Sequence, residues 1–166
     1  MDISRLHQRN ELLLNSANDG IYGLDLDGRA TFINQSAARL LGWEPESLIG
    51  KPLHSIIHHH RADGRPYPSE ECPNCAAYRD GQSHQVNDDI FWRKDGSSFP
   101  VESASTPLME GDLIKGAVVT FRDITQRVKD EAKLRHYQSN LEKMVESRTE
   151  ELSEVNKDLR DFVYIV

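Results

Sequence analysis

Histidine and cysteine, the side chains best suited to hold a transition metal or to react with an oxidant, gather in one stretch of the chain. Three of the seven histidines and both cysteines lie in HHHRADGRPYPSEECPNC, residues 58–75. Cys72 and Cys75 have the C-x-x-C spacing that zinc sites and redox pairs share. His54 precedes His58 by four residues, so a helix would carry both rings on one face. These four residues offer a Cys₂His₂ set for zinc.

Other features of this stretch favour a surface loop with two packed, reduced thiols. His58, His59 and His60 are consecutive, so we expect their side chains to point in different directions and to be solvated. The histidine pair precedes the cysteine pair, which is not the order of a zinc finger, and the segment between the pairs is long and polar. A C-x-x-C pair can also form a disulfide. The residues alone leave three interpretations, a loop, a redox pair and a metal site, of which we favour the loop.

The composition is that of an acidic globular protein. The chain of 166 residues is 37% hydrophobic and 28% charged, which suits one domain with additional helix. The net charge of −7 argues against nucleic acid or an anionic membrane as a partner, because both attract basic surfaces. No run of about 18 apolar residues occurs, and the start MDISRLHQRNELLL lacks the pattern of a signal peptide. We therefore expect a cytoplasmic segment without membrane insertion, in which free thiols are the norm.

Two parts of the chain differ in kind. Residues 1–125 contain all ten glycines and all seven prolines, and residues 126–166 contain none. The change falls within FRDITQR, residues 121–127. Apolar residues at helical spacing predict a flanking helix over residues 1–17. We expect a folded domain over residues 18–125, followed by one long helix.

The hydrophobic pattern before residue 126 predicts short helices and five strands. Strands are expected over residues 21–25, 29–33, 86–93, 99–108 and 114–122, with turns at Asp27-Gly28, KDGSS and Gly111-Asp112. The last strand is the most apolar and is expected at the centre. Helices are expected over residues 35–41, 45–49, 53–57 and 72–80, the first capped by Asn34 and ended by Gly42. This order predicts an α+β fold, an antiparallel five-stranded sheet with short helices on one face.

Several motifs carry a family resemblance. GIYGLDLDGRATFIN followed by QSAARLLGWEPESLIGKPL resembles the opening of a PAS domain, and DDIFWRKDGSSFPVESASTPL with IKGAVVTFRDITQR resembles its last three strands. The resemblance covers roughly residues 10–125 and follows the family's order. It implies a sensory or dimerising module rather than a catalyst.

A sheet covered by helices on one face can enclose a small pocket, and the same apolar residues would otherwise form an ordinary core. The residues expected at this position are Leu24, Phe32, Leu40, Ile49, Leu53, Ile57, Phe91, Val101, Val119 and Phe121. Flavin-linking PAS domains carry a cysteine where this chain has NQSAARLLGW, so covalent flavin chemistry is not expected. His54 and His58 lie near the position of a haem ligand in haem PAS domains. We expect no cofactor, with haem or non-covalent flavin as the alternatives.

The histidine and cysteine stretch also resembles a PAS insertion of the form His-His-x-x-Ala-Asp-Gly…Glu-Cys-Pro. In that form Cys72 has a counterpart and Cys75 generally has none, and a lone cysteine needs no metal. We therefore expect no stoichiometric zinc and two free thiols.

Asp123, Ile124 and Thr125 resemble the short motif at the exit of many PAS domains. Asp123 or Thr125 can accept hydrogen bonds from the free N–H groups of the outgoing helix. A cap joined to the last strand would pass shifts of that strand to the helix. We expect these three residues to relay the signal.

The long helix carries apolar residues alternately four and three positions apart, which predicts the seam of a parallel coiled coil and a homodimer. The seam consists of Leu141, Val145, Arg148, Leu152, Val155, Leu159, Phe162 and Val166. A second register through Leu134, Tyr137, Leu141 and Met144 competes with it.

The segment NLEKMVESRTEELSEVNKDLRDFVYIV resembles the helix that leads into the dimerisation and phosphotransfer domain of a sensor histidine kinase. The resemblance implies two-component signal transduction, with a kinase domain farther along the parent chain. These residues hold no Ser-His-Asp-Leu box and no ATP-binding motif, so we expect no catalysis by them. Alternatives are a small-molecule or cofactor receptor, a Cys/His redox or metal sensor, and a module feeding a cyclic-nucleotide synthase, against which DLRDFVYIV argues.

Overall fold

The computed structural model describes residues 18–165, so the flanking helix expected over residues 1–17 and the seam position Val166 lie outside the described residues. The chain divides into two compact units between Thr125 and Gln126. We call residues 18–125 the globular unit. The second unit is a single helix.

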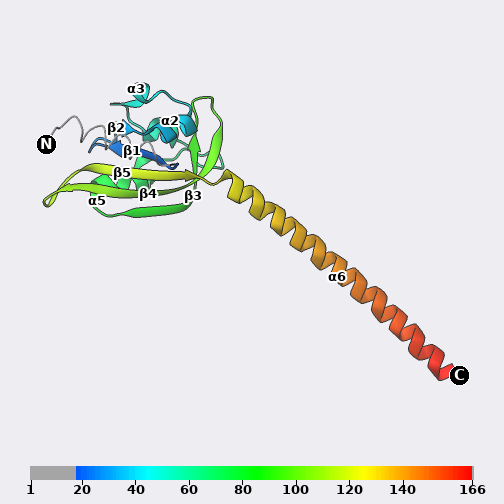
Figure 1. Ribbon diagram of the computed structural model, residues 1–166. Coiled ribbons are helices and arrows are strands. Elements are labelled where there is room, and N and C mark those ends of the chain that lie inside the picture. The colour runs from blue at the N-terminus through cyan, green and yellow to red at the C-terminus, as the bar shows by residue number, and fades with distance from the viewer. Residues whose placement is uncertain (1–17, 166) are drawn as a thin grey trace, which may run out of the picture. The chain divides into compact units, whose positions relative to one another are not determined.

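A five-stranded antiparallel sheet forms the globular unit, as the sequence predicts. Its strands are β1 (Gly20–Leu24), β2 (Ala30–Ile33), β3 (His84–Trp92), β4 (Ser98–Glu110) and β5 (Leu113–Asp123). Their order across the sheet is β2-β1-β5-β4-β3, which places the most apolar strand at the centre (Figure 1). The expected turns are present, and Gly28, Gly96 and Gly111 have the positive φ that such turns require.

Short helices connect the two halves of the sheet. They are α2 (Gln35–Leu41), α3 (Pro45–Leu48), α4 (His54–Ile57) and α5 (Pro73–Asp80), with a 3₁₀ turn η1 (Ser69–Glu71) before α5. Helix α2 begins where Asn34 Oδ1 accepts the N–H of Ala37 at 2.9 Å, and it ends at Gly42 with φ 71°. These are the residues at which the sequence predicts its start and end.

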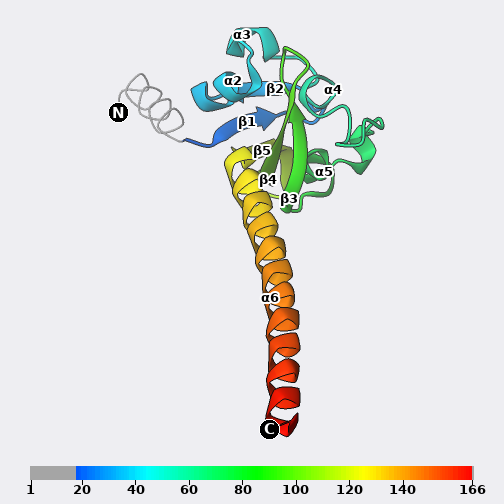
Figure 2. The ribbon, with the colours of Figure 1, turned by 90° about the vertical axis from the view of Figure 1, so that its right-hand side faces the viewer.

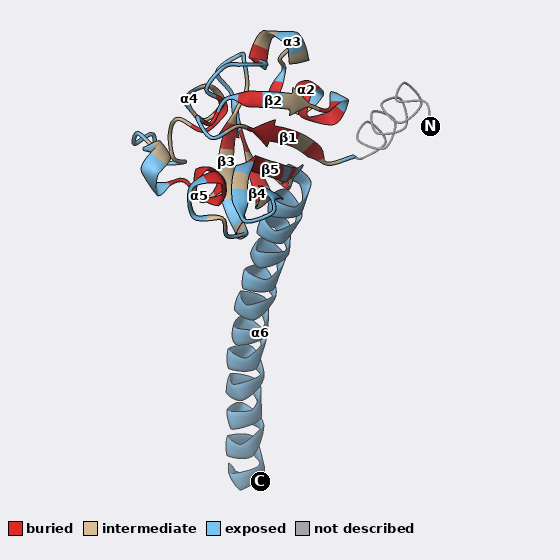
Figure 3. Ribbon diagram, turned by 90° about the vertical axis from the view of Figure 1, so that its left-hand side faces the viewer, coloured by how far each residue is buried: buried red, intermediate tan, exposed pale blue. Residues whose placement is uncertain are grey.

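Alternation along the strands produces one buried sheet face. In β4 the side chains of Phe99, Val101, Ser103 and Ser105 are buried, and the residues between them are more exposed. Helix α5 packs across β3, β4 and β5, and α2 packs on β1. Figure 2 shows these helices around the sheet, and Figure 3 shows the buried residues concentrated in β1, β4, β5 and α5. The core therefore lies between the sheet and its helices.

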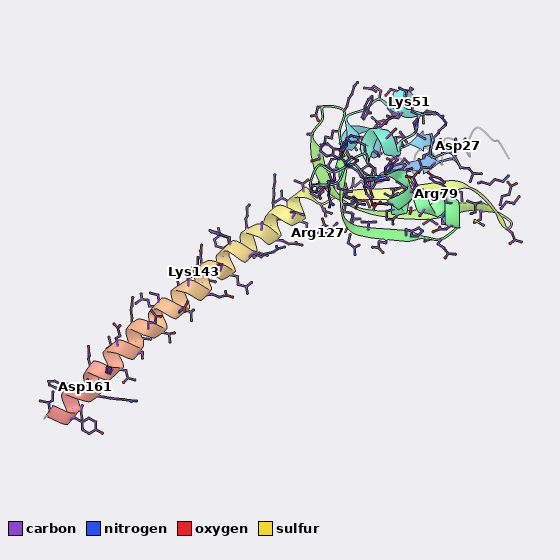
Figure 4. All side chains as sticks on the ribbon, turned by 180° about the vertical axis from the view of Figure 1, so that it is seen from behind. Asp27, Lys51, Arg79, Arg127, Lys143 and Asp161 are labelled. Atoms are coloured by element: carbon purple, nitrogen blue, oxygen red, sulfur yellow. The ribbon has the colours of Figure 1, made fainter. Side chains whose placement is uncertain are left out.

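The second unit is helix α6 (Thr125–Ile165), 41 residues long. At 1.5 Å per residue it is about 60 Å long. None of its described residues is buried, and its ribbon in Figure 3 shows the exposed colour along its length. Side chains project from all sides of this helix, from Arg127 through Lys143 to Asp161 (Figure 4). Within residues 18–165, no helix combines the length and apolar character that crossing a membrane requires.

Candidate functional site

Most of the residues expected to line a pocket are packed in the core. Seven are buried, namely Leu24, Leu53, Ile57, Phe91, Val101, Val119 and Phe121, and Leu40 packs against them while partly exposed. Phe91 and Phe121 contact each other with ring centroids 5.1 Å apart. These side chains fill the space between sheet and helices.

Two of the expected pocket residues lie elsewhere. Ile49 is 44% exposed, and its neighbour Leu48 takes the buried position because α3 is a single turn that ends at Leu48. Phe32 pairs with Gly23 in the sheet, and its ring covers the space where a Gly23 side chain would lie. Its neighbour Ile33 packs against the core instead. A register shift in the β1–β2 pairing, between Gly23 and Leu24, breaks the simple alternation that placed Phe32 inside.

His54 and His58 converge inside the globular unit, whereas we expected a solvated side chain for His58. His58 is 2% exposed, and its Nε2 lies 2.9 Å from Asp89 Oδ1 on β3. His54 is half-buried, and its Nε2 lies 2.7 Å from the carbonyl oxygen of Tyr67. The two rings are 5.3 Å apart, because one helical turn separates the residues.

The next two histidines point away from this pair, as consecutive residues should. The ring of His59 stacks on Trp92 with centroids 5.2 Å apart. The indole N–H of Trp92 donates to the carbonyl oxygen of His60 at 2.9 Å. Of the four histidines at positions 54 and 58–60, His54 and His58 face the core.

Both cysteines are buried as free thiols beside the His54 and His58 pair. Cys72 precedes α5, and Cys75 lies in its first turn. The Sγ atom of Cys72 is 3.3 Å from Nδ1 of His58. His54, His58 and Cys72 each offer one ligand atom, and these three atoms lie within 4.8 Å of one another. We call His54, His58, Cys72 and Cys75 the His–Cys cluster.

A cavity of about 10 Å³ lies within the His–Cys cluster. The four cluster residues line it, together with Tyr22, Leu24, Leu53 and Asn74. A volume of about 10–15 Å³ holds one water molecule. The cavity therefore has room for a single small species rather than for an organic ring.

The two thiol groups interact, and this interaction changes their pKa values in opposite directions. The interaction with Cys72 lowers the pKa of Cys75, and His54 adds to the effect. The interaction with Cys75, together with burial, raises the pKa of Cys72. Burial lowers the pKa of His54, but the neighbouring Cys75 side chain and the hydrogen bond with the Tyr67 carbonyl group outweigh burial and raise the pKa.

Polar residues behind the cluster were not predicted from the sequence. Asn74 is 2% exposed, and its side-chain amide exchanges hydrogen bonds with the hydroxyl group of Ser103 at 3.2 and 3.3 Å. Ser103 lies on the inward face of β4, which the period of two does predict. Asp89 lies where the β3–β4 register shifts, and no local signal marks that position.

The three expected relay residues connect β5 to α6. Asp123 Oδ1 accepts the N–H of Thr125 at 2.8 Å, and Asp123 Oδ2 forms an ion pair with Arg93 at 3.5 Å. Ile124 is 5% exposed, and its N–H donates to the carbonyl oxygen of Pro100. The hydroxyl group of Thr125 is buried and has no partner among the described residues. Asp123, rather than Thr125, therefore provides the side-chain cap.

The expected seam residues from Leu141 to Phe162 all lie exposed on α6. The apolar members, Leu141, Val145, Leu152, Val155, Leu159 and Phe162, are between 55% and 68% exposed. Arg148 forms an ion pair with Glu151 on the same helix at 3.4 Å. The competing positions Leu134, Tyr137 and Met144 are equally exposed, so neither register is covered.

Comparison with known proteins identifies relatives of the globular unit. A family model described as PAS fold matches residues 8–124. The probable diguanylate cyclase DgcE of Escherichia coli is 27% identical over 138 residues, which are 76% of this chain and 12% of that protein. The chain thus spans about an eighth of the length of this relative.

Solved structures show the same fold. The PAS domain of a protein from Colwellia psychrerythraea is 26% identical, with a TM-score of 0.59 over 75% of this chain and 99% of that one. A PAS domain from a two-component sensor histidine kinase is 17% identical, with a TM-score of 0.56 over 74% of this chain and 99% of that one.

Proposed function

The chain belongs to the PAS fold family, and on this premise we propose that it is a sensory module that relays a signal through helix α6 to an output domain. One observation carries the proposal. Strand β5 ends at Asp123 and α6 begins at Thr125, so a single residue separates the central strand from the helix. The Asp123 cap and the buried side chain of Ile124 tie this junction to the sheet. A change in the globular unit that moves β5 would therefore reach the start of α6.

We propose that the output helix works as a parallel homodimer. Its seam residues are apolar, regularly spaced and uncovered, and a helix of about 60 Å with an open apolar stripe needs a partner. A second copy offers the same stripe in the same register, which is the arrangement of a parallel coiled coil. Two competing registers at the start of the seam would let a small rotation of the helices serve as the signal.

The output domain that we propose is a histidine kinase. The resemblance of residues 140–166 to the entry helix of kinase dimerisation domains supports it, and one structural relative comes from a two-component sensor histidine kinase. A second candidate is a diguanylate cyclase, which the relative from Escherichia coli favours. Neither candidate assigns catalysis to residues 1–166. Both outputs suit a cytoplasmic protein whose partners are a second copy and its own downstream domain.

We propose further that the globular unit holds no haem or flavin. The filled core and the cavity of about 10 Å³ support this, because an organic ring needs several hundred Å³. The alternative function, a cofactor or small-molecule receptor, requires the core to rearrange. An absorption spectrum of freshly purified protein tests the point, since bound haem or flavin absorbs visible light.

The relay is tested by changing the phase of α6 in the full-length protein. Inserting four residues after Glu146 rotates the following helix by about 40°, whereas inserting seven changes the phase by about 20° and keeps the heptad pattern. We expect the four-residue insertion to abolish the signal response and the seven-residue insertion to retain it. Autophosphorylation and cyclic dinucleotide synthesis are both measured, which separates the two candidate outputs. An unchanged response in the four-residue variant would contradict the relay.

A further inference from the structure

We propose a Zn²⁺ site inside the globular unit, with four ligands from two segments: His54, His58, Cys72 and Cys75. Two imidazole nitrogens and two thiolates are the donor set that zinc takes in tetrahedral structural sites. This inference is independent of the proposed output. It replaces the surface loop and the metal-free thiols that we expected from the sequence.

The distances within the His–Cys cluster fit the coordination sphere. Zinc bonds of about 2.3 Å to sulfur and about 2.0 Å to nitrogen separate neighbouring ligand atoms by about 3.3–3.8 Å. The Sγ atom of Cys72 and Nδ1 of His58 are 3.3 Å apart, and the ligand atoms of His54, His58 and Cys72 all lie within 4.8 Å of one another. Cys75 lines the same cavity from the first turn of α5. A small contraction of this arrangement brings the ligand atoms of His54, His58 and Cys72 to bonding distance, and we assign Cys75 as the fourth ligand from its place in the cavity lining.

Both histidines already have the outer partners that zinc ligands need. A ligating imidazole usually donates its second N–H to a carboxylate or a backbone carbonyl group, which holds the ring and leaves the other nitrogen free to bind. Nε2 of His58 lies 2.9 Å from the Asp89 carboxylate, and Nε2 of His54 lies 2.7 Å from the Tyr67 carbonyl oxygen. Each Nδ1 is thereby available to the metal. Nδ1 of His54 is buried and has no hydrogen-bond partner among the described residues.

The surroundings favour an ion over an organic ligand. The cavity of about 10 Å³ admits one small species, and Tyr22, Leu24 and Leu53 close its apolar side. Two thiolates and two neutral imidazoles balance the charge of Zn²⁺, so the buried site is neutral overall. Binding releases the two thiol protons to solvent, and no oxidant or reductant is needed.

Two features of the sequence argued against a metal, the long segment between the two ligand pairs and the consecutive histidines, and the fold accommodates both. Residues 59–71 leave α4 and return to α5, so the long polar segment serves as the connection between the two ligand pairs. His58 is buried, and only His59 and His60 turn away from the cluster. A zinc ion here would join α4 to the start of α5. We therefore expect zinc to stabilise the globular unit, since a ligand that binds only the folded state adds to its stability.

The first test is metal content. The protein, purified without chelators or metal-affinity resin from cells supplied with zinc, should carry one zinc per chain by elemental analysis. After zinc removal under reducing conditions, Co²⁺ should produce the d–d bands of a tetrahedral ion and thiolate-to-cobalt charge-transfer absorption. Absence of zinc together with absence of these bands would overturn the proposal. A Cys72–Cys75 disulfide in freshly isolated, metal-free protein would replace the zinc site with a redox pair.

Matched variants identify the ligands. His54→Gln should lose zinc, and Cys75→Ser should lower zinc affinity by at least about tenfold, whereas His59→Gln should keep both content and affinity. Asp89→Ala, which removes a positioning residue, should lower affinity by about 10- to 100-fold and leave the cobalt spectrum tetrahedral. Unchanged affinity in Cys75→Ser would show that the fourth ligand is misassigned, and loss of zinc in His59→Gln would contradict the proposed set. Circular dichroism of every variant establishes that it is folded. If a ligand variant does not fold, X-ray absorption of the zinc-loaded parent protein tests the ligand set instead, and it should count two sulfur and two nitrogen ligands.

Discussion

The globular unit buries its large apolar side chains, whereas helix α6 leaves its own exposed. In the globular unit, large residues such as Phe91, Leu41 and Ile57 are completely buried within the same chain. In α6, residues of the same kind, such as Leu152 and Phe162, are 68% and 66% exposed. The globular unit therefore contains its own core, whereas the apolar stripe of α6 is uncovered, which supports the proposed pairing with a second helix. Substitutions in the two regions should therefore affect different measurements.

The largest effect is expected in the core. Phe91→Ala removes a ring that is completely buried and contacts Phe121, and such changes cost about 3–5 kcal/mol of unfolding free energy. Phe162→Ala, which removes the same ring from an exposed position on α6, should not change the stability of the globular unit. Urea unfolding followed by tryptophan fluorescence measures this difference, because both tryptophans, Trp43 and Trp92, lie in the globular unit. Equal destabilisation by both changes would refute the contrast between the regions.

The next effect concerns dimerisation through α6. Leu152→Ala should weaken the dimer by roughly 2 kcal/mol or more, which raises the dissociation constant at least about 30-fold. Ser153→Ala, one position off the seam, should not change it. Sedimentation equilibrium measures both constants, and tryptophan-detected unfolding of the globular unit should remain that of the parent protein in both variants. If the parent protein is a monomer at micromolar concentrations, the coiled-coil prediction fails.

A smaller effect is expected from the cap of α2. Asn34 is 3% exposed, and its Oδ1 atom accepts N–H groups of both Ala37 and Ile21 at 2.9 Å, which joins the helix to β1. Asn34→Ala leaves these groups buried without their partner, at a cost of about 1–3 kcal/mol. Asn34→Asp keeps the acceptor and should retain more of the stability. Urea unfolding ranks the three proteins, and a larger loss for the aspartate would show that the donor side of Asn34 dominates.

Removing the cap at the start of α6 should lower the unfolding free energy less than removing the Asn34 cap, but it should reduce the signal response. Asp123→Ala removes the acceptor for the Thr125 N–H and the ion pair with Arg93, and losing a cap typically costs about 0.5–2 kcal/mol. We expect the globular unit to stay folded while signal-dependent output falls. Asp123→Asn keeps the hydrogen-bond acceptor and serves as the control. A normal signal response in Asp123→Ala would argue that the cap is only structural.

The smallest effect is expected at the surface of the sheet. Arg122 is 61% exposed and forms ion pairs with Asp19 at 2.8 Å and Glu102 at 3.4 Å. Exposed ion pairs contribute little because water screens them, so Arg122→Gln should change the unfolding free energy less than the core and cap variants above. The difference should shrink further in high salt, because mobile ions screen exposed charges. A loss comparable to that of Phe91→Ala would mean that burial of apolar side chains is not the main source of stability in the globular unit.

Sequence reasoning located the elements well and individual side chains less well. Asn34, Gly42 and the turn glycines mark element ends because the hydrogen bonds and backbone angles involved are local. Ile49 was placed one residue away from the buried Leu48, and Phe32 one residue away from Ile33, which packs partly buried against the core. A one-turn helix and a register shift decide these positions, and neither has a strong local signal. Errors of one residue are decisive in a strand, since neighbouring side chains point to opposite faces.

The sequence by itself determined the five strands, the caps, the turns and the regular apolar spacing of α6, because these follow from backbone preferences and from periods of two, three or four residues. Only the tertiary structure decided that His54 and His58 meet Cys72 and that Asp89 lies behind them. The distance between α4 and α5 depends on how both segments pack on the sheet, not on the spacing between them in the chain. The same histidine type is buried at residue 58 and half-exposed at residues 59 and 60, because adjacent side chains leave the backbone in different directions and only one of those directions leads into the core.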